Sequence, residues 1–327
     1  MDILSAASLP WLDNPRALLE QAWRSGRLPH SLLLISIPGL GAEALAHWTA
    51  ALVLCDQPDA APCGRCASCQ LLIADSHPDL KRVGLEEDAQ QLKVDQIRAL
   101  IESLSLSSYR SGFKVGIVES GEALNVNGAN AFLKTLEEPT QSTLLILVAT
   151  PSHRLPATIA SRCQRLTVRA PEAEAARAWL GTQRPGVNRW DAALALAGGA
   201  PLKALELEAA GIEALEQDMR ESLKRLASGT TDVTMLADRW ARSDPVLRLT
   251  WLENWITTRV RTQLGGTELE QTAEPVRLPA ALLKPKIRRL FELLDAAREL
   301  RRLASTGLNQ QLALEALLLE GRAALGR

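Results

Sequence analysis

The sequence predicts an N-terminal α/β domain with a parallel sheet and an inserted metal-binding module, followed by an all-helical C-terminal part. Up to about residue 168, short apolar runs alternate with helical stretches, which is typical of parallel strands joined by helices. From "PEAEAARAWL" (171–180) onward, the strand-like runs stop and apolar residues follow helical spacing. Four cysteines close together in the α/β part indicate the inserted module.

Five apolar runs are the expected strands. They are "SLLLI" (31–35), "DLKRV" (79–83), "KVGIV" (114–118), "TLLILVA" (143–149) and "QRLTV" (164–168). The change of pattern after residue 168 predicts one domain boundary, and "GGAP" (198–201), which ends a short helical unit, predicts another. The predicted domains therefore span residues 1–168, 169–207 and 208–327.

The composition excludes functions that depend on bulk charge. The 327 residues include 37 Lys and Arg against 38 Asp and Glu, and 46% are hydrophobic, which is enough for well-packed cores. The first twenty residues carry acidic side chains and two prolines and have no apolar run of signal-peptide or membrane-spanning length. We expect a cytoplasmic protein that meets DNA only locally or through partners.

The cysteine cluster "CDQPDAAPCGRCASC" contains two overlapping C-x-x-C steps. Two residues between thiols allow a tight turn to aim both sulfurs at one point, and four thiolates complete a tetrahedral shell. Cys55, Cys63, Cys66 and Cys69 therefore predict one structural zinc ion per chain. The alternatives are a redox pair, either Cys63 with Cys66 or Cys66 with Cys69, and unligated buried thiols.

The stretch "SIPGLGAEAL" (36–45) resembles a phosphate-binding loop that lacks the side chains for binding phosphate and magnesium. It lies between an expected strand and an expected helix, as such loops do. Alanine stands where the loop needs Lys, and a glutamate, which favours the helix N-terminus and repels a triphosphate, stands where it needs Ser or Thr. An ordinary tight turn is the alternative interpretation. The residues of this degenerate loop are Ser36, Gly39, Gly41, Ala42 and Glu43.

The acidic half of a nucleotide-hydrolysing site is altered as well. After its third strand, an ATPase of this kind presents an Asp for the magnesium shell and a Glu that polarises water. Here the third expected strand is followed by Glu119 and then Ser120. Because both halves of the machinery are degraded together, we expect this chain to bind no ATP and to have no catalytic activity of its own.

Five further motifs accompany the cysteine cluster. They are "LPHSLLL" (28–34), "VDQIRAL" (94–100), "NGANAFLKTLEEP" (127–139), "LPATIASRCQRL" (155–166) and "LNQQLALEALLLEG" (308–321). Together with the cluster, they identify the chain as a member of the clamp-loader branch of the AAA+ proteins. The resemblance is strong over residues 28–168 and weaker beyond. It implies an AAA+ domain with a zinc module, a small helical lid and a helical collar through which subunits associate.

The resemblance also implies partners and a site. Members of this branch form a hetero-pentameric ring with gamma or tau and delta subunits of DNA polymerase III, which loads the sliding clamp onto primed DNA. The arginine of the "SRC" triplet, here Arg162, is then an arginine finger that acts in trans on the ATP of a neighbouring subunit. A guanidinium suits that task because it is always charged and offers a planar fork of donors. The alternative is an ordinary surface arginine.

The leading hypothesis is therefore a non-hydrolysing clamp-loader subunit in a DNA-directed DNA polymerase holoenzyme. One rival is an active ATPase of the same fold with a divergent phosphate loop. Another is a zinc-dependent DNA-binding protein, which would need basic residues around the metal. Arg65 is the only basic residue inside the cysteine cluster.

Overall fold

The computed structural model describes residues 5–86, 89, 91–110, 112–151, 155–187, 189–263, 285–304 and 309–325. The chain divides into two units, which are treated separately. The first comprises Met1–Pro185 with Gly198–Lys203, and the second comprises Gly186–Ala197 with Ala204–Arg327. Residues 264–284 of the predicted C-terminal domain lie outside the described part.

The first unit is built on a five-stranded parallel sheet with strand order β2-β3-β4-β1-β5. Central β1, β3 and β4 consist almost wholly of buried residues, as expected for strands covered on both faces. All five predicted strands are confirmed, with ends that differ by at most one residue. The strands are β1 (Ser31–Ile35), β2 (Leu80–Val83), β3 (Lys114–Val118), β4 (Thr143–Ala149) and β5 (Gln164–Thr167).

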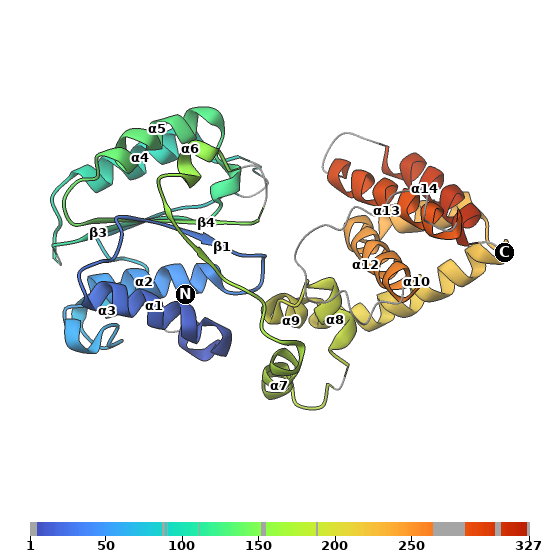
Figure 1. Cartoon of the computed structure of the whole chain (residues 1–327), viewed down its shortest axis with the longest axis horizontal. Coiled ribbons are helices and arrows are strands. Elements are labelled where there is room, and N and C mark those ends of the chain that lie inside the picture. Colours follow the sequence, from blue (N-terminus) through green and yellow to red (C-terminus); the bar gives the residue numbers. More distant parts are fainter. Residues whose placement is uncertain are drawn as a thin grey trace. The chain divides into compact units, whose positions relative to one another are not determined.

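Helices cover both faces of the sheet (Figure 1). On one face lie α1 (Asp13–Arg24), α2 (Ala42–Leu54) and α3 (Ala67–Ile73), and on the other lie α4 (Val94–Ser105), α5 (Val126–Glu137) and the short α6 (Ala157–Ala160). Helix α2 is apolar on nearly all sides because it is almost completely buried. The remaining elements of this unit are η1 (Ser5–Ser8), η2 (Pro10–Leu12), η3 (Pro58–Ala60), η4 (Gly121–Ala123) and α7 (Ala173–Gln183).

The second unit is helical throughout its described residues, as the sequence predicts. Its core is a cluster of large apolar side chains that includes the fully buried Trp240, Leu252 and Leu290. Nearly buried Glu253 accepts hydrogen bonds from Arg301, which pairs α12 with α13. The helices are α8 (Asp191–Leu196), α9 (Pro201–Ala209), which begins in the first unit, α10 (Ile212–Ala227), α11 (Val233–Arg242), α12 (Pro245–Gln263), α13 (Pro285–Leu303) and α14 (Gln310–Leu325).

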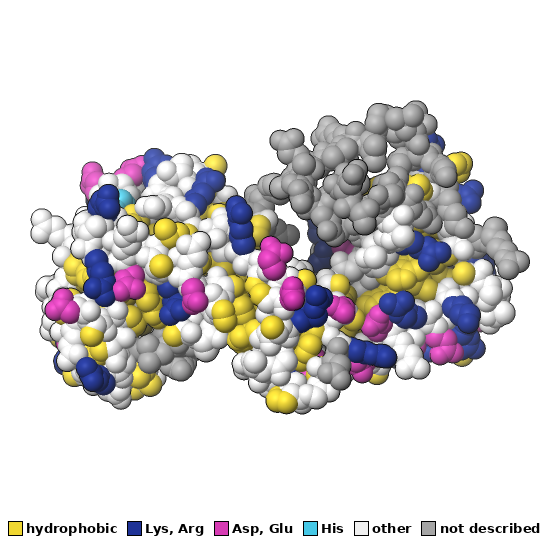
Figure 2. Space-filling model, turned by 60° about the horizontal axis from the view of Figure 1, so that its bottom comes forward, with side chains coloured by type: hydrophobic (Ala, Val, Ile, Leu, Met, Phe, Trp, Pro, Cys, Tyr) yellow, Lys and Arg dark blue, Asp and Glu magenta, His cyan; other side chains and the backbone are white. Residues whose placement is uncertain are grey.

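The surface carries charges of both signs. On the face drawn in Figure 2, Lys and Arg side chains are interspersed with Asp and Glu, in agreement with a net charge of −1. Within the described part of the chain, no helix is both long enough and apolar enough to cross a membrane.

Candidate functional site

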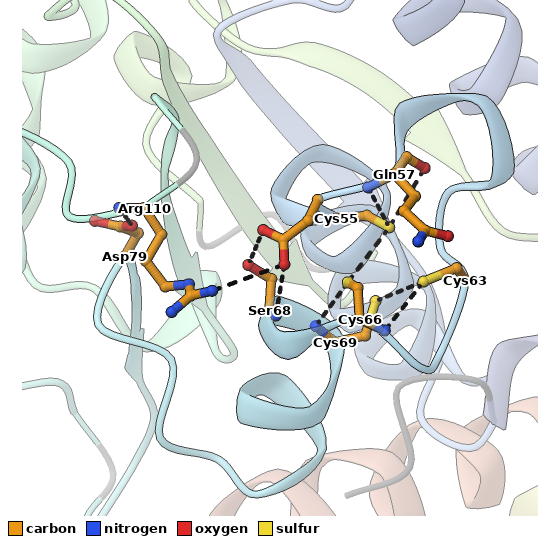
Figure 3. Close-up of polar contacts among 9 residues, drawn as sticks. Cys55, Gln57, Cys63, Cys66, Ser68, Cys69, Asp79 and Arg110 are labelled. Atoms are coloured by element: carbon orange, nitrogen blue, oxygen red, sulfur yellow. Dashed lines mark hydrogen bonds and ion pairs between the residues drawn. The ribbon is translucent and has the colours of Figure 1, made fainter.

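The four clustered cysteines converge on one point. Cys55 lies just after α2, Cys63 and Cys66 lie in the loop before α3, and Cys69 lies in the first turn of α3. Their sulfur atoms lie within 4.8 Å of one another and point toward a common centre (Figure 3). The Sγ atoms of Cys55 and Cys66 are 3.8 Å apart, and those of Cys63 and Cys69 are 4.0 Å apart. The four cysteines could therefore hold a metal ion.

The spacing between sulfurs fits a tetrahedral metal. A tetrahedral shell with metal–sulfur distances of ~2.3 Å has sulfur–sulfur edges of ~3.8 Å. Backbone N–H groups also point at the sulfurs: Cys66 N lies 3.3 Å from Cys63 Sγ, and Cys69 N lies 3.4 Å from Cys66 Sγ. Such N–H donors stabilise thiolates and orient them as ligands.

The thiols differ in their environment. Backbone N–H groups of Arg65 and then Cys66 lower the pKa of Cys63 to about 6. Burial raises the pKa of Cys55 and of Cys69. A bound divalent cation favours the thiolate form of every ligand, so metal binding and deprotonation of the two buried thiols are linked.

A network of polar contacts ties this module to the sheet (Figure 3). The Asp56 carboxylate accepts hydrogen bonds from the backbone N–H and the hydroxyl of Ser68, at 3.0 and 2.7 Å, and forms an ion pair with Arg110 at 3.8 Å. The Ser68 contacts lower the pKa of Asp56. Buried Asp79, directly before β2, accepts from the backbone N–H groups of Tyr109 and Arg110. The loop that contains Arg110 therefore links the cysteine module to the sheet.

The degenerate phosphate loop connects β1 to α2, as the sequence predicts. Gly39 and Gly41 both have positive φ, at 86° and 80°, a conformation that favours glycine. Ser36, Leu40, Gly41 and Ala42 are buried, whereas Glu43 is partly exposed in the first turn of α2. The loop thus turns at two glycines and lies largely buried within its own unit.

Two segments pack against this loop. On one side, Leu202 N donates a hydrogen bond to Gly39 O at 3.1 Å, and a Cβ placed on Gly39 would lie 2.6 Å from Lys203 N. On the other side, a Cβ on Gly41 would lie 2.6 Å from Cδ1 of Leu9, and Trp11 Nε1 donates to Leu40 O at 2.8 Å. Segment 198–203 and the N-terminal segment thus take up space directly beside the loop.

Glu119, directly after β3, has Arg82 and His47 as partners. Arg82 Nη1 of β2 lies 3.3 Å from Glu119 Oε1, and Nε2 of buried His47, on α2, lies 3.5 Å from the same oxygen. These contacts, first with His47 and then with Arg82, lower the pKa of Glu119. The neighbouring Ser120 accepts a backbone hydrogen bond from Ala123 N and so starts η4.

Arg162 lies in the turn between α6 and β5. Its backbone is fixed, because its N–H donates to Ile159 O and its carbonyl accepts from the hydroxyl of buried Ser31 at 2.8 Å. Its guanidinium is partly exposed and pairs with Glu137 at the end of α5. The neighbouring Cys163 is a buried thiol remote from the cysteine cluster, as expected, and burial raises its pKa.

Comparison with known proteins identifies the family. A family model described as "DNA polymerase III, delta subunit" matches residues 13–172, and one described as "DNA polymerase III, delta subunit, C terminal" matches residues 214–322. The DNA polymerase III subunit delta' of Pseudomonas aeruginosa is 36% identical over 262 residues, which cover 79% of each chain. The chain belongs to the DNA polymerase III delta-prime family.

Other relatives agree with this assignment. The subunit delta' of Escherichia coli is 31% identical over 95% of this chain and 94% of its own. The DNA polymerase III subunit tau of Escherichia coli is 31% identical over 46% of this chain and 23% of its own. The predicted clamp-loader branch of the AAA+ proteins is therefore confirmed for this delta-prime family member.

Sequence reasoning missed the partners of the predicted site residues. It identified Glu119 but not Arg82, although an arginine inside a strand was a visible signal. It identified Arg162 but not Glu137, which lies 25 positions away in the sequence. No local pattern pointed to Leu9 as a neighbour of the loop.

Proposed function

We propose that this chain works as the delta-prime subunit of a DNA polymerase III clamp loader, in which it binds no ATP and provides Arg162 to the ATP of a neighbouring subunit. The proposed partners are gamma or tau and delta subunits in a five-membered ring. Through that ring the chain would support loading of the sliding clamp onto primed DNA. The family relationship supports the subunit identity, and the geometry around the degenerate loop supports the finer assignment.

The observation that carries the non-hydrolysing role is the packing of segment 198–203 onto the phosphate loop. A phosphate cradle works because backbone N–H groups and a helix N-terminus face an open space that an anion can enter. Here backbone and Cβ atoms of Lys203 lie so close to Gly39 that even a methyl group would not fit between them. The loop serves as a packing surface for its own unit.

Neutralisation of Glu119 supports the same role. In a hydrolysing enzyme, carboxylates at this place hold magnesium and orient water. In this chain Arg82 supplies the positive charge beside Glu119, and Nε2 of His47 lies 3.5 Å from the same carboxylate oxygen. The carboxylate therefore has a structural partner in place of a metal ion.

We assign the predicted domains to matching roles. Residues 1–168 form the AAA+-like domain, 169–207 the lid and 208–327 the collar. Support for a collar that associates with other subunits comes from one exposed apolar stripe on α14. Its four residues are spaced four, three and four positions apart, so they lie on one face of the helix. These residues are Leu312, Ala316, Leu319 and Ala323.

For the cysteine module we propose one zinc ion with a structural role. Four thiolates with tetrahedral spacing match the preference of zinc, and a closed shell leaves no position for water or substrate. The residues that would hold it are Cys55, Cys63, Cys66 and Cys69. The contacts of Asp56 with Ser68 and Arg110 would hold the zinc-bound module in a fixed position relative to the rest of the unit.

Reconstitution of the complete clamp loader tests the arginine finger. We expect Arg162→Ala to leave the chain folded and able to assemble, while clamp- and DNA-stimulated ATP hydrolysis falls by about 10³-fold at the affected interface. Arg165→Ala is the matched control, because Arg165 is exposed three positions away and its Nε donates to the carbonyl of Ala160 at 3.3 Å. Unchanged hydrolysis with Arg162→Ala, or an equal loss with Arg165→Ala, would refute the role.

Nucleotide binding by the isolated chain tests the other half of the proposal. Equilibrium dialysis with radiolabelled ATP and magnesium should find no bound nucleotide. Stoichiometric binding would favour the active ATPase with a divergent loop instead.

A further inference from the structure

The guanidinium of Arg162 is held along one edge by Glu137. Nε of Arg162 donates to Glu137 Oε1 at 2.8 Å, and Nη2 donates to the same oxygen. Nη1 donates to the Thr158 carbonyl at 3.1 Å. The side edge of the guanidinium, formed by Nε and Nη2, is thus fixed by a carboxylate, while about a third of the side chain stays exposed, with a relative accessibility of 35%.

Glu137 and Arg162 are both anchored to the start of β1. His30 Nε2 donates to the carbonyl of Leu136, the residue before Glu137, at 3.1 Å. The next residue, Ser31, donates its hydroxyl to the carbonyl of Arg162 at 2.8 Å. Two adjacent residues, the one before β1 and the first of β1, therefore set the distance between the end of α5 and the turn that carries Arg162.

The position of Glu137 is unfavourable for a carboxylate unless it has a partner. It is the last residue of α5, where the partial negative charge of the helix end repels an anion. The contact with Arg162 offsets that repulsion. Helix energetics alone would favour a neutral or basic residue here, so the carboxylate is best explained by what it does to Arg162.

We propose that Glu137 is the positioning residue of Arg162, holding the guanidinium by its side edge so that its outer edge meets a phosphoryl group of nucleotide bound by a neighbouring subunit. This inference rests on the proposed function of Arg162. It adds a second residue of this chain to the shared site and assigns it a separate role, because Glu137 would touch no substrate.

The physical reason is preorganisation. A free arginine side chain samples many rotamers, and each must be given up when the side chain binds a phosphate. A carboxylate that already fixes the guanidinium plane removes part of that loss before the nucleotide arrives. Glutamine keeps an oxygen acceptor for Nε and Nη2 but removes the charge, so it should hold the same geometry more weakly.

The test is a double-mutant cycle in the complete clamp loader, with ATP hydrolysis measured at several ATP concentrations. We expect Glu137→Ala to lower the maximal rate about two- to five-fold, the range for loss of a partly exposed ion pair, and to leave half-saturating ATP unchanged. Glu137→Gln should recover part of the rate. Glu138→Ala is the matched control, because Glu138 is an exposed carboxylate at the next position with no contact to Arg162 in the described structure.

The cycle separates this inference from the proposed function. In the Arg162→Ala background, Glu137→Ala should cause no further loss, because it acts through Arg162. Loss of rate with Arg162→Ala but not with Glu137→Ala would overturn the positioning role alone. The same conclusion would follow if Glu137→Ala lowered the rate by the same factor in the Arg162→Ala background as in the wild type. No loss with Arg162→Ala would overturn the arginine finger and the positioning role together. Circular dichroism melting and gel filtration of the loader should give wild-type results for each variant, and a failure to assemble would identify Glu137 as merely structural.

Discussion

Replacing Gly39 by alanine tests whether segment 198–203 really lies against the phosphate loop. Gly39 has a φ of 86°, and an added Cβ would meet Lys203 Cβ at 2.5 Å and Lys203 N at 2.6 Å. Both neighbouring atoms belong to the backbone or lie next to it, so rotation of a flexible side chain cannot relieve the clash. Either the loop or segment 198–203 must move.

The cost has two parts. Holding an alanine in the left-handed region costs ~1–2 kcal/mol, and forcing a methyl group into a filled space costs ~1–3 kcal/mol more. Gly39→Ala should therefore lower the free energy of unfolding of the first unit by roughly 2–5 kcal/mol. Gly26→Ala isolates the first part, because Gly26 has a φ of 66° and its added Cβ would have no neighbour within 4 Å.

Urea unfolding followed by circular dichroism measures both variants. Gly26→Ala should lose only the backbone part, and Gly39→Ala should lose measurably more. The difference between the two variants reports the packing of segment 198–203 on the loop. Equal losses would refute the packing and with it the main structural support for an occluded nucleotide cradle.

Two other predictions concern the proposed zinc site and a partly buried carboxylate. Elemental analysis should find about one zinc per chain. The Cys69→Ser variant should lose the zinc, whereas Cys163→Ser, outside the cluster, should keep it. A native protein without metal would contradict the assignment. The lowered pKa of Glu119 stabilises the folded state above the unfolded pKa of about 4.3, and this contribution disappears as the pH falls through the folded value. Glu119→Gln should therefore weaken the loss of stability below about pH 4.3 relative to the wild type, and parallel pH profiles would argue against the contacts with His47 and Arg82.

The strands could be predicted because their signal is local. A buried parallel strand is a short apolar run, and central β1, β3 and β4 are such runs. The edge strands β2 and β5 are more polar and more exposed, and a short run of strand-forming residues marks them instead. The predicted ends differ from the observed ones for a visible reason at Asp79. Its side chain binds the N–H groups of Tyr109 and Arg110, which keeps Asp79 in the turn before β2.

The convergence of the four cysteines could be predicted for the same reason. All four cysteines lie in one short segment, so their spacing alone restricts the geometry. The contacts that fix the module to the sheet could not be read in this way. Arg110 pairs with Asp56 across more than fifty residues of sequence, and only the order of the strands brings the two segments together.

The surroundings of the phosphate loop depend on contacts between residues that are even farther apart in the sequence. Gly39 and Lys203 are separated by most of the first unit, and no periodic pattern relates them. The sequence shows which catalytic residue types are missing from the loop. It does not show what has taken their place, because packing between distant segments depends on the complete fold.

One physical explanation connects the contacts of Glu119 with those of the phosphate loop. A magnesium ion and a catalytic lysine would have supplied the positive charge around Glu119 and the phosphates, and Arg82 with His47 now lies beside Glu119. Bound nucleotide would have filled the space over the loop, and Lys203 now lies against it. An empty cradle with an unpaired carboxylate would destabilise the domain. In the proposed function, internal partners remove that cost, so that the domain stays rigid without nucleotide and holds Glu137, at the end of α5, and Arg162, before β5, in fixed positions beside the start of β1.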